Sequence, residues 1–594
     1  MTTGLWESDD PWDVRRALGA GGDLAAYNVA GVLEAADVHV ARRLCAIAGD
    51  VDPRSALAVA LAVRAVRHGS VCLALEEVPE LAPELPWPDV DEWRDALTGS
   101  RVVASGAVAV EHGLVYLDRY RAQEQQVAGD LVARSGRPAP DVDAERLDAA
   151  LGRLYPDPTY AEQRVACAGA ATRWTTVLTG GPGTGKTTTV TRILAVLTEQ
   201  LGPDARIALA APTGKAAARL QEQVLAAATD LPAADAARLQ GLRATTLHRL
   251  LGFRRDNQTR FRHDRSNRLP HDLVIVDETS MVSLTMMARL LEAVRPDARL
   301  VLVGDPDQLA SVEAGAVLDD LVAGFRGRSA SPVVELGTVH RFGATIGELA
   351  QAIRAGDADA AIAVLRAGHD DVRWVETDDP AAVAEAVRAA ALPAAIAVRQ
   401  AALAGASAAA LAALDEHRML SAHRDTVRWW NSRVELWLRE AEPGATDLFD
   451  RMYAGRPLLI TRNDPGLGLY NGDTGVVVRG ADGRPRAVVA GAGGPVELAP
   501  GRLADVETVH AMTIHKSQGS QAREVTVLLP DADSRLLTRE LLYTAVTRAR
   551  GVVRLIGGEE ALRAALGRRA HRASGLQRRL AGSLDSAETT RTRR

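Results

Sequence analysis

The stretch that decides the fold reads Gly180-Gly181-Pro182-Gly183-Thr184-Gly185-Lys186-Thr187. It matches the phosphate-binding pattern G-x-x-x-x-G-K-[ST], follows an apolar run at 175–179 and opens a helical pattern at 188–197. Glycines at these positions let backbone N–H groups close around phosphate oxygens, and the N-terminus of the next helix adds partial positive charge. The sequence therefore predicts a site for a nucleoside triphosphate.

Short apolar runs recur around this loop. They lie at 175–179, 206–211, 273–277, 299–303 and 332–336, with helical stretches between them. This alternation is typical of a parallel sheet with crossover helices, and so of the α/β class. The α/β pattern resumes at 506–557, after an alanine-dense stretch at 380–415 that we expect to be helical. Between them, short runs separated by Asn471-Gly472 and Asp482-Gly483 predict β-hairpins.

Composition sets broad limits on the function. The 594 residues suggest three to five domains, and 47% apolar with 25% charged residues excludes a fibrous or wholly disordered chain. A net charge of −6 means that nucleic acid would have to bind in a local groove. Cys45, Cys72 and Cys167 lie far apart, which excludes a disulfide scaffold. Without a signal peptide or an apolar run of about 18 residues, we expect a cytoplasmic protein that spans no membrane.

Lysine is rare in this chain. Of 70 lysines and arginines, only Lys186, Lys215 and Lys516 are lysine. Because arginine is used almost everywhere else, we expect these three positions to need a compact ammonium group. Each one falls inside a recognisable motif.

Two carboxylates follow the apolar run that begins at Leu273. Asp277 at the tip of this strand is suited to hold hydrated Mg²⁺ together with the Thr187 hydroxyl, and Glu278 to accept a proton from the attacking water. Lys186 would reach the β- and γ-phosphates of ATP. The pair of carboxylates is a specific signal only because it follows a phosphate-binding loop.

Three further polar residues predict coupling between nucleotide hydrolysis and domain movement. Gln308 follows another strand tip and could bind the γ-phosphate or the attacking water. Arg341 and Arg548 would come from a second domain and stabilise the γ-phosphate only when the cleft closes. The alternative for either arginine is an ordinary surface charge.

Seven segments carry a family resemblance. Taken in order, they resemble the motifs of superfamily 1 DNA helicases, and more narrowly the RecD family of superfamily 1B, the alpha subunits of RecBCD enzymes (exodeoxyribonuclease V). The segments lie at 181–187, 211–217, 276–281, 303–309, 340–342, 513–520 and 543–549. A weaker match covers 62–73 and 114–120. The resemblance implies two RecA-like P-loop NTPase domains, a helical N-terminal domain and a small SH3-like β insertion.

The resemblance also implies domain limits. We expect a helical partner-docking domain at 1–135, a linker at 136–160, RecA-like domain 1A at 161–340 with a basic hairpin insertion at about 249–271, RecA-like domain 2A at 341–455 and 506–581, the SH3-like insertion at 456–505, and a disordered tail at 582–594. Without the resemblance, the N-terminal region would be only an isolated helical domain.

Site residues follow from the same resemblance. The expected nucleotide contacts are Gln163, which resembles an adenine-reading glutamine, and Gly180, Gly181, Pro182, Gly183, Thr184, Gly185, Lys186, Thr187, Thr188 and Gly519. The expected DNA contacts are Pro212, Thr213, Lys215, Thr246, His248, Thr513, His515 and Lys516. Such groups suit phosphate contacts, which hold a strand without reading its sequence.

Residues 253–269 are basic, with interleaved aromatic residues and a turn signal. In the family, a pin that splits the duplex is inserted here, and an aromatic ring could stack on the last base pair. A solvated charged loop is the alternative.

The leading hypothesis is an ATP- and Mg²⁺-dependent 5′→3′ DNA helicase subunit that processes double-strand breaks with RecB-like and RecC-like partners. Its ligands would be single-stranded DNA and duplex ends, and the direction comes from the resemblance alone. We expect no nuclease centre, because all three lysines lie in helicase motifs. The alternatives are a stand-alone superfamily 1 helicase or DNA-stimulated ATPase, and an ATP-bound scaffold that does not translocate.

Overall fold

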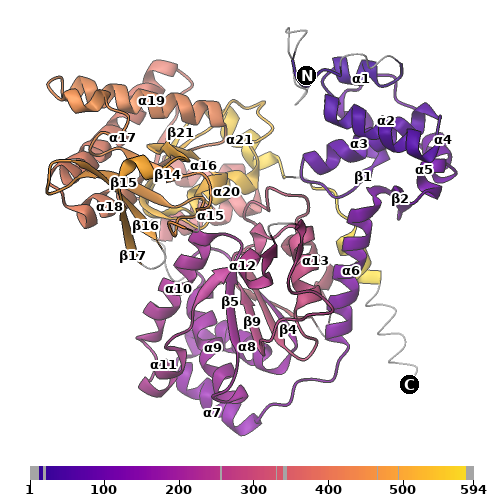
Figure 1. Cartoon of the computed structure of the whole chain (residues 1–594), viewed down its shortest axis with the longest axis horizontal. Coiled ribbons are helices and arrows are strands. Elements are labelled where there is room, and N and C mark those ends of the chain that lie inside the picture. Colours follow the sequence, from indigo (N-terminus) through magenta and orange to yellow (C-terminus); the bar gives the residue numbers. More distant parts are fainter. Residues whose placement is uncertain are drawn as a thin grey trace.

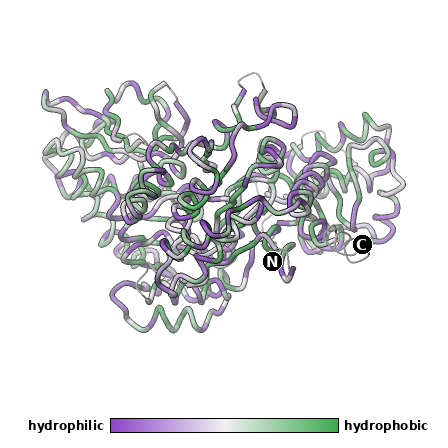
Figure 2. Tube along the Cα trace, turned by 90° about the horizontal axis from the view of Figure 1, so that it is seen from below, coloured by the Kyte–Doolittle hydropathy of each residue, from purple (hydrophilic) through white to green (hydrophobic). Residues whose placement is uncertain are grey.

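The computed structural model describes residues 13–17, 22–254, 257–328, 331–338, 344–464, 466–491, 494–570 and 572–582. Figure 1 shows an N-terminal helical domain beside two α/β domains, one below and one to the upper left. Hydrophobic and hydrophilic stretches alternate along the whole trace instead of gathering in one part (Figure 2). The expected tail from 583 onward lies outside the described residues.

The first α/β domain is built on a six-stranded parallel sheet with the order β11-β4-β10-β9-β5-β6. Its strands are β4 (Thr175–Gly180), β5 (Ile207–Ala211), β6 (Ala244–Thr246), β9 (Leu273–Val276), β10 (Arg299–Gly304) and β11 (Val333–Leu336). Its helices are α8 (Ala161–Thr172), α9 (Lys186–Leu201), α10 (Gly214–Ala228), α11 (Ala233–Leu239), α12 (Leu247–Leu251), α13 (Leu284–Ala293) and α14 (Val317–Phe325). All five predicted apolar runs are confirmed as strands.

Each central strand of this sheet is buried on both faces. In β10, for example, Leu300 and Leu302 contribute to one core cluster, while Val301 and Val303 contribute to another. Because neighbouring residues of a strand point to opposite faces, a strand covered on both sides reads as an unbroken apolar run. The sheet therefore presents only its strand ends to ligands.

The second α/β domain has a five-stranded parallel sheet with the order β12-β21-β20-β13-β19. Its strands are β12 (Val372–Val375), β13 (His417–Ser421), β19 (Ala511–Thr513), β20 (Ala522–Leu528) and β21 (Ala549–Ile556). Its helices are α15 (Ala344–Ala355), α16 (Ala358–Arg366), α17 (Pro380–Leu403), α18 (Ser407–Glu416), α19 (Arg424–Ala441), α20 (Arg539–Val546) and α21 (Glu559–Gly567). The helical prediction for 380–415 is confirmed.

An antiparallel sheet interrupts this second domain. Its strand order is β17-β16-β15-β14-β18, with β14 (Pro457–Ile460), β15 (Thr474–Arg479), β16 (Pro485–Gly491), β17 (Gly494–Leu498) and β18 (Val506–Thr508). The two predicted turn glycines, Gly472 and Gly483, adopt φ values of 94° and 76°, which favour glycine. The predicted β insertion is confirmed, while its SH3-like character stays a prediction.

The N-terminal domain is mainly helical, as expected, but it also contains a small sheet. Its helices are α1 (Ala25–Val29), α2 (Ala35–Ala48), α3 (Pro53–Arg67), α4 (Val90–Thr98), α5 (Arg101–Ala104) and α6 (Asp118–Ser135). The strands β1 (Leu73–Ala74), β2 (Val108–Glu111) and β3 (Leu114–Leu117) form an antiparallel sheet. Helix α6 packs on α13, so this domain is joined to the first α/β domain by a shared core.

The stretch expected to be a linker, 136–160, contains a buried helix, so the expectation is wrong for the residues of that helix. Residues 144–154 form α7 (Ala144–Leu154), which Asp143 caps by accepting a hydrogen bond from Arg146 N–H. Leu147, Leu151 and Leu154 are buried in the core shared with α9. The many Pro, Gly, Asp and Arg residues around this stretch obscured the helical spacing of the three leucines.

Helix α17 is, within the described ranges, the single helix long and apolar enough to cross a membrane by length and composition. Core helices of soluble proteins pass the same test, and alanine supplies most of the apolar character of this one. It packs on α18 and α19, and its buried Arg399 forms ion pairs with Glu442 and Asp447. The expectation of no membrane span therefore stays a prediction.

The C-terminal segment crosses back from the second α/β domain to the N-terminal domain, and is the yellow trace that passes beside α6 in Figure 1. Leu576 and Leu580 are fully buried in the core of the first α/β domain. Arg579 forms ion pairs with Glu111 and with the fully buried Glu124. The segment thus connects the second α/β domain, which it leaves, to the first α/β domain and to the N-terminal domain.

We predict that Arg579→Ala lowers the free energy of unfolding by about 3–5 kcal/mol, because it leaves the buried Glu124 without its charge partner. Urea titration followed by far-UV circular dichroism measures the change. Arg428→Ala, which breaks a highly exposed ion pair with Asp425, is the control and should change nothing measurable. A similar, small effect of both variants would contradict the role given to Arg579.

Candidate active site

The phosphate-binding loop connects β4 to α9 and requires its glycines. Gly183 and Gly185 have φ values of 84° and 83°, a region that side chains rarely adopt. A Cβ atom at Gly180 would lie 2.7 Å from Thr184 Oγ1 and 2.8 Å from the carbonyl oxygen of Leu336. Only glycine lets these backbones approach so closely.

Lys186 and Thr187 open α9 with their polar atoms directed at neighbouring groups. Lys186 Nζ donates to the carbonyl oxygens of Gly180 and Gly181, at 2.6 and 2.9 Å. Thr187 Oγ1 donates to Gln223 Oε1 at 3.0 Å. In this structure the loop's own carbonyls hold the ammonium group that is expected to bind phosphate.

The two carboxylates lie directly after β9. Glu278 adopts φ 52°, which is unusual for a residue other than glycine, and its backbone N–H donates to Asp277 Oδ1 at 2.9 Å. Burial, followed by the charge of Glu278, raises the pKa of Asp277 above its ordinary value. A strained backbone at a candidate catalytic carboxylate is a common feature of functional sites.

Gln308 joins the two α/β domains. Its Nε2 donates to Asp305 Oδ2 at 2.9 Å, and its Oε1 accepts from Arg548 Nη2 at 2.9 Å. Arg548 is buried and also donates from Nε to the carbonyl oxygen of Thr544 at 3.0 Å. Burial lowers the pKa of Arg548, partly offset by the negative charge of Glu278.

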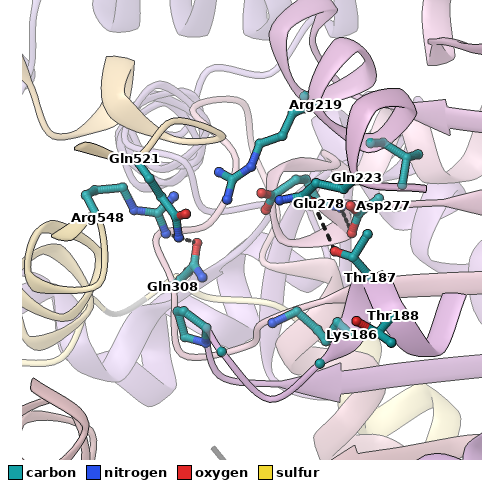
Figure 3. A pocket seen from close by; sticks show the side chains of 15 residues that line it. Lys186, Thr187, Thr188, Arg219, Gln223, Asp277, Glu278, Gln308, Gln521 and Arg548 are labelled. Atoms are coloured by element: carbon teal, nitrogen blue, oxygen red, sulfur yellow. Dashed lines mark hydrogen bonds between the residues drawn. The ribbon is translucent and has the colours of Figure 1, made fainter. Parts of the chain in front are cut away.

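A cavity of about 300 Å³ lies between these groups. Figure 3 shows Lys186 and Thr187 on one side of it and Gln308 with Arg548 on the other. The cavity brings together ten of the predicted residues, namely Pro182, Gly183, Gly185, Lys186, Thr187, Thr188, Asp277, Glu278, Gln308 and Arg548. Arg341 lies outside the described residues, so its prediction stays open.

The cavity is also lined by Arg219, Gln223 and Gln521, which are not among the predicted site residues. Arg219 and Gln223 stand four residues apart on α10, a spacing that places both on one face of a helix. That spacing was visible in the sequence, but the direction of the face was not.

The other predicted nucleotide contacts do not line this cavity; they are Gln163, Gly180, Gly181, Thr184 and Gly519. Gln163 is buried on α8 and donates from Nε2 to the carbonyl oxygen of Thr184 at 3.4 Å. Gly519 has φ 71°, and a Cβ atom there would lie 3.6 Å from Ala216 Cβ. Gly181 faces Tyr543, because an added Cβ would lie 2.9 Å from the Tyr543 hydroxyl.

The predicted DNA contacts gather at the carboxyl ends of neighbouring strands. Thr213 caps α10 after β5, and Thr246 caps α12 after β6, each by accepting a backbone hydrogen bond. Pro212 precedes Thr213 in the same connection. Thr513 ends β19, the strand at one edge of the second sheet. Both sheets therefore present these residues at their strand ends.

Lys215 begins α10 beneath the β insertion. Burial, then repulsion from Arg418, lowers the pKa of Lys215 to about 8, against the opposing charges of Asp415 and Asp473. Next to it, a Cβ atom at Gly214 would lie 2.6 Å from Tyr470 Cβ. The insertion thus rests directly on the start of α10.

His515 and Lys516 follow Thr513. Burial, then the charges of Arg572 and Arg424, lowers the pKa of His515. Lys516 Nζ forms an exposed ion pair with Glu507 at 2.9 Å. In this structure Glu507 therefore holds the ammonium group that is expected to bind DNA phosphate.

The basic insertion contains a two-stranded antiparallel pair, β7 (Phe253–Arg254) and β8 (Asn257–Phe261). His248 packs beneath it, with ring centroids 6.3 Å from Phe253 and 5.7 Å from Phe261. Burial lowers the pKa of His248. Phe261 is buried, whereas Phe253 is 48% exposed, so Phe253 is the aromatic of this pair that remains able to meet a base.

Comparisons with known proteins show the family to which the chain is similar. Family models match an AAA domain at 163–314, a UvrD-like helicase C-terminal domain at 508–556, and the N-terminal domain of RecBCD enzyme subunit RecD at 29–116. RecBCD enzyme subunit RecD of Mycobacterium tuberculosis (strain ATCC 25618 / H37Rv) is 57% identical over 581 residues, which is 96% of this chain and 98% of that protein.

Two further relatives widen the comparison. RecBCD enzyme subunit RecD of Mycolicibacterium smegmatis is 58% identical over 564 residues, covering 92% of this chain and 98% of that protein. The ATP-dependent RecD2 DNA helicase of Deinococcus radiodurans is 33% identical over 454 residues, covering 76% of this chain and 56% of that protein.

The fold and the cavity define a superfamily 1 helicase with two RecA-like domains and ATP as its nucleotide. The chain belongs to the RecD family and is an ATP-dependent DNA helicase subunit.

We predict that Gly214→Ala lifts the β insertion from α10, because the new methyl group would clash with Tyr470. Hydrogen exchange should become faster at the amides of Tyr470 and Asp473, which close a turn through hydrogen bonds between these two residues. Tyr470→Gly in the same chain should restore the packing. Gly347→Ala, where no atom lies within 4 Å of the added Cβ, is the control, and an equal response from it would contradict the contact.

Proposed function

We propose that the chain is the 5′→3′ helicase and translocase subunit of a RecBCD-type helicase–nuclease that processes double-strand DNA breaks for recombinational repair. The contact between Gln308 and Arg548 carries this proposal, because it ties the nucleotide cavity to the relative position of the two RecA-like domains. A single-domain ATPase would contain no such contact between two RecA-like domains.

In this proposal the chain's own residues perform the hydrolysis. Lys186 leaves the loop carbonyls and binds the β- and γ-phosphates, while Glu278 accepts the proton of the attacking water. Gln308 orients that water or the γ-phosphate, and Gln163 reads the adenine ring. The backbone N–H groups of the glycine loop hold the remaining phosphate oxygens.

The cavity also fits Mg²⁺. The Thr187 hydroxyl and the Asp277 carboxylate both line it, and oxygen atoms are the ligands that Mg²⁺ prefers. When bound, the ion would neutralise phosphate charge. The chain's part is to supply these two oxygen ligands; a lone pair of Thr187 Oγ1 would bind the ion while its O–H still donates to Gln223.

Arg548 would couple hydrolysis to closure of the domains. Its guanidinium group comes from the second RecA-like domain and lines a cavity made mainly by the first. A buried cation placed there stabilises the charge that develops on the γ-phosphate. We expect Arg341 to act in the same way from the same domain.

We infer that single-stranded DNA lies across the strand ends of both sheets, held by the eight predicted contacts and covered by the β insertion. Because these contacts belong to different domains, closure around ATP and opening after hydrolysis would move one set past the other. The hairpin β7–β8 would meet the duplex, with Phe253 at its exposed side.

We infer that RecB-like and RecC-like subunits complete the enzyme in the cytoplasm, and that the N-terminal domain binds one of them. The cutting activity would then reside in a partner. A stand-alone helicase is the alternative, and co-purification with two larger chains separates the two cases.

We predict that Arg548→Ala lowers kcat for ATP by about 10³-fold or more, because the transition-state charge loses its buried partner. Nucleotide affinity should change little, since the glycine loop and Lys186 are intact. Single-strand-stimulated ATPase assays and fluorescent-nucleotide titration measure the two quantities. Parallel loss of affinity and kcat would assign Arg548 to folding or binding instead.

Unwinding of tailed duplexes tests the proposed direction. We expect the protein alone to unwind a duplex with a 5′ single-stranded tail and not one with a 3′ tail, and the assembly with its partners to unwind the 5′-tailed duplex. Because the RecB-like partner could contribute its own motor, the matched control is the same assembly carrying Lys186→Ala in this chain. Retained 5′-tail unwinding in that control would place the motor elsewhere.

A further inference from the structure

Helix α10 presents a polar face to the nucleotide cavity. The cavity-lining residues of this helix are Ala216, Arg219, Leu220 and Gln223. Their separations of three and four residues place them on one side of the helix. Gln223 already reaches the phosphate-binding loop, since its Oε1 accepts from Thr187 Oγ1 at 3.0 Å. Side chains of α10 are therefore long enough to contact groups bound in the cavity.

Arg219 points into the cavity from the turn before Gln223. In Figure 3 its guanidinium group lies between Gln521 and Arg548 on one side and Gln223 with Glu278 on the other. The charge of Arg219 also acts on Asp277, where it opposes the rise in pKa that burial causes. Arg219 thus belongs to the end of the cavity that holds the two carboxylates, where the bond to the γ-phosphate would be cut.

Among the described residues, three cations line the cavity, and each comes from a separate element. Lys186 begins α9, Arg219 lies on α10, and Arg548 follows α20 in the second RecA-like domain. A triphosphate carries several negative charges, and a planar guanidinium group matches two phosphate oxygens at once. Lys186 and Arg548 approach from opposite sides, and Arg219 fills the remaining side.

We propose that Arg219 is a further nucleotide-binding residue, which contacts the γ-phosphate of ATP from α10. This inference rests on the proposed assignment of the cavity to ATP and adds a further cationic contact to it. The same helix begins at Thr213 and Lys215, the predicted DNA contacts. Arg219 therefore connects the DNA-contacting end of the helix to the reacting end of the nucleotide.

The test compares the affinities of the chain for a triphosphate and for a diphosphate. Fluorescent ADP and a fluorescent non-hydrolysable ATP analogue are titrated with the full chain, in wild type, Arg219→Gln and Arg219→Lys. We expect Arg219→Gln to raise the Kd of the triphosphate about tenfold or more and to change the Kd of ADP less than about twofold. Arg219→Lys keeps the positive charge but cannot bind two phosphate oxygens at once. Its Kd for the triphosphate should therefore lie between those of wild type and Arg219→Gln.

Two matched variants separate the outcomes. Glu222→Gln changes an exposed side chain of the same helix and should leave both affinities unchanged. Lys186→Ala should weaken both nucleotides; if it does not, the ATP site itself is misassigned. If Lys186→Ala acts as expected but Arg219→Gln changes neither affinity, or changes both equally, the γ-phosphate contact of Arg219 is overturned. Melting temperatures of all variants exclude unfolding as the cause.

Discussion

A buried hydrogen bond from Arg548 Nη2 to Gln308 Oε1 joins the two domains inside the nucleotide cavity. Both side chains are almost fully buried, so neither has water as a substitute partner when the other withdraws. Leaving a guanidinium group or an amide oxygen buried without a partner is costly. The bond therefore links the position of the second RecA-like domain to the state of the cavity, and any rearrangement there must supply a replacement. Phosphate oxygens would be such a replacement for the guanidinium group of Arg548, whereas Gln308 Oε1 needs a donor such as water.

Other contacts restrict how the two domains can separate. Leu309 N–H donates to Thr544 Oγ1 at 2.9 Å, and Gln518 Nε2 donates to the carbonyl oxygen of Leu309 at 2.8 Å. Beyond the cavity, the C-terminal segment leaves the second domain and buries Leu576 and Leu580 in the core of the first. The C-terminal segment thus adds a second connection between the two domains, beyond the hydrogen bonds beside the cavity.

The sequence predicted the sheets well because of how parallel strands are buried. A strand covered on both faces, such as β9 or β10, appears as an apolar run whatever lies around it. The phosphate-binding loop and the carboxylate pair were predicted for a similar reason, since their chemistry is local to a few adjacent residues. Helix α7 was missed because its three leucines stand among turn-forming residues. Three features depend on how distant elements pack, and no local pattern encodes them. They are the place of Arg219 in the cavity, the close approach of Gly214 to Tyr470, and the path of the C-terminal segment.

Helix α10 shows why such long-range packing matters for function. Lys215 and Gln223 are eight residues apart, which corresponds to about 12 Å along a helix. Over that length a helix behaves as a stiff rod, because each turn is held by its own hydrogen bonds. Its first turn lies beneath Tyr470 of the insertion and beside Gly519 of the second domain, while its second and third turns line the cavity. A shift of the insertion therefore cannot move Lys215 without also moving Arg219 and Gln223. The contacts of Lys215 with DNA and those of Arg219 and Gln223 with the phosphates would then change together, as a translocating motor requires.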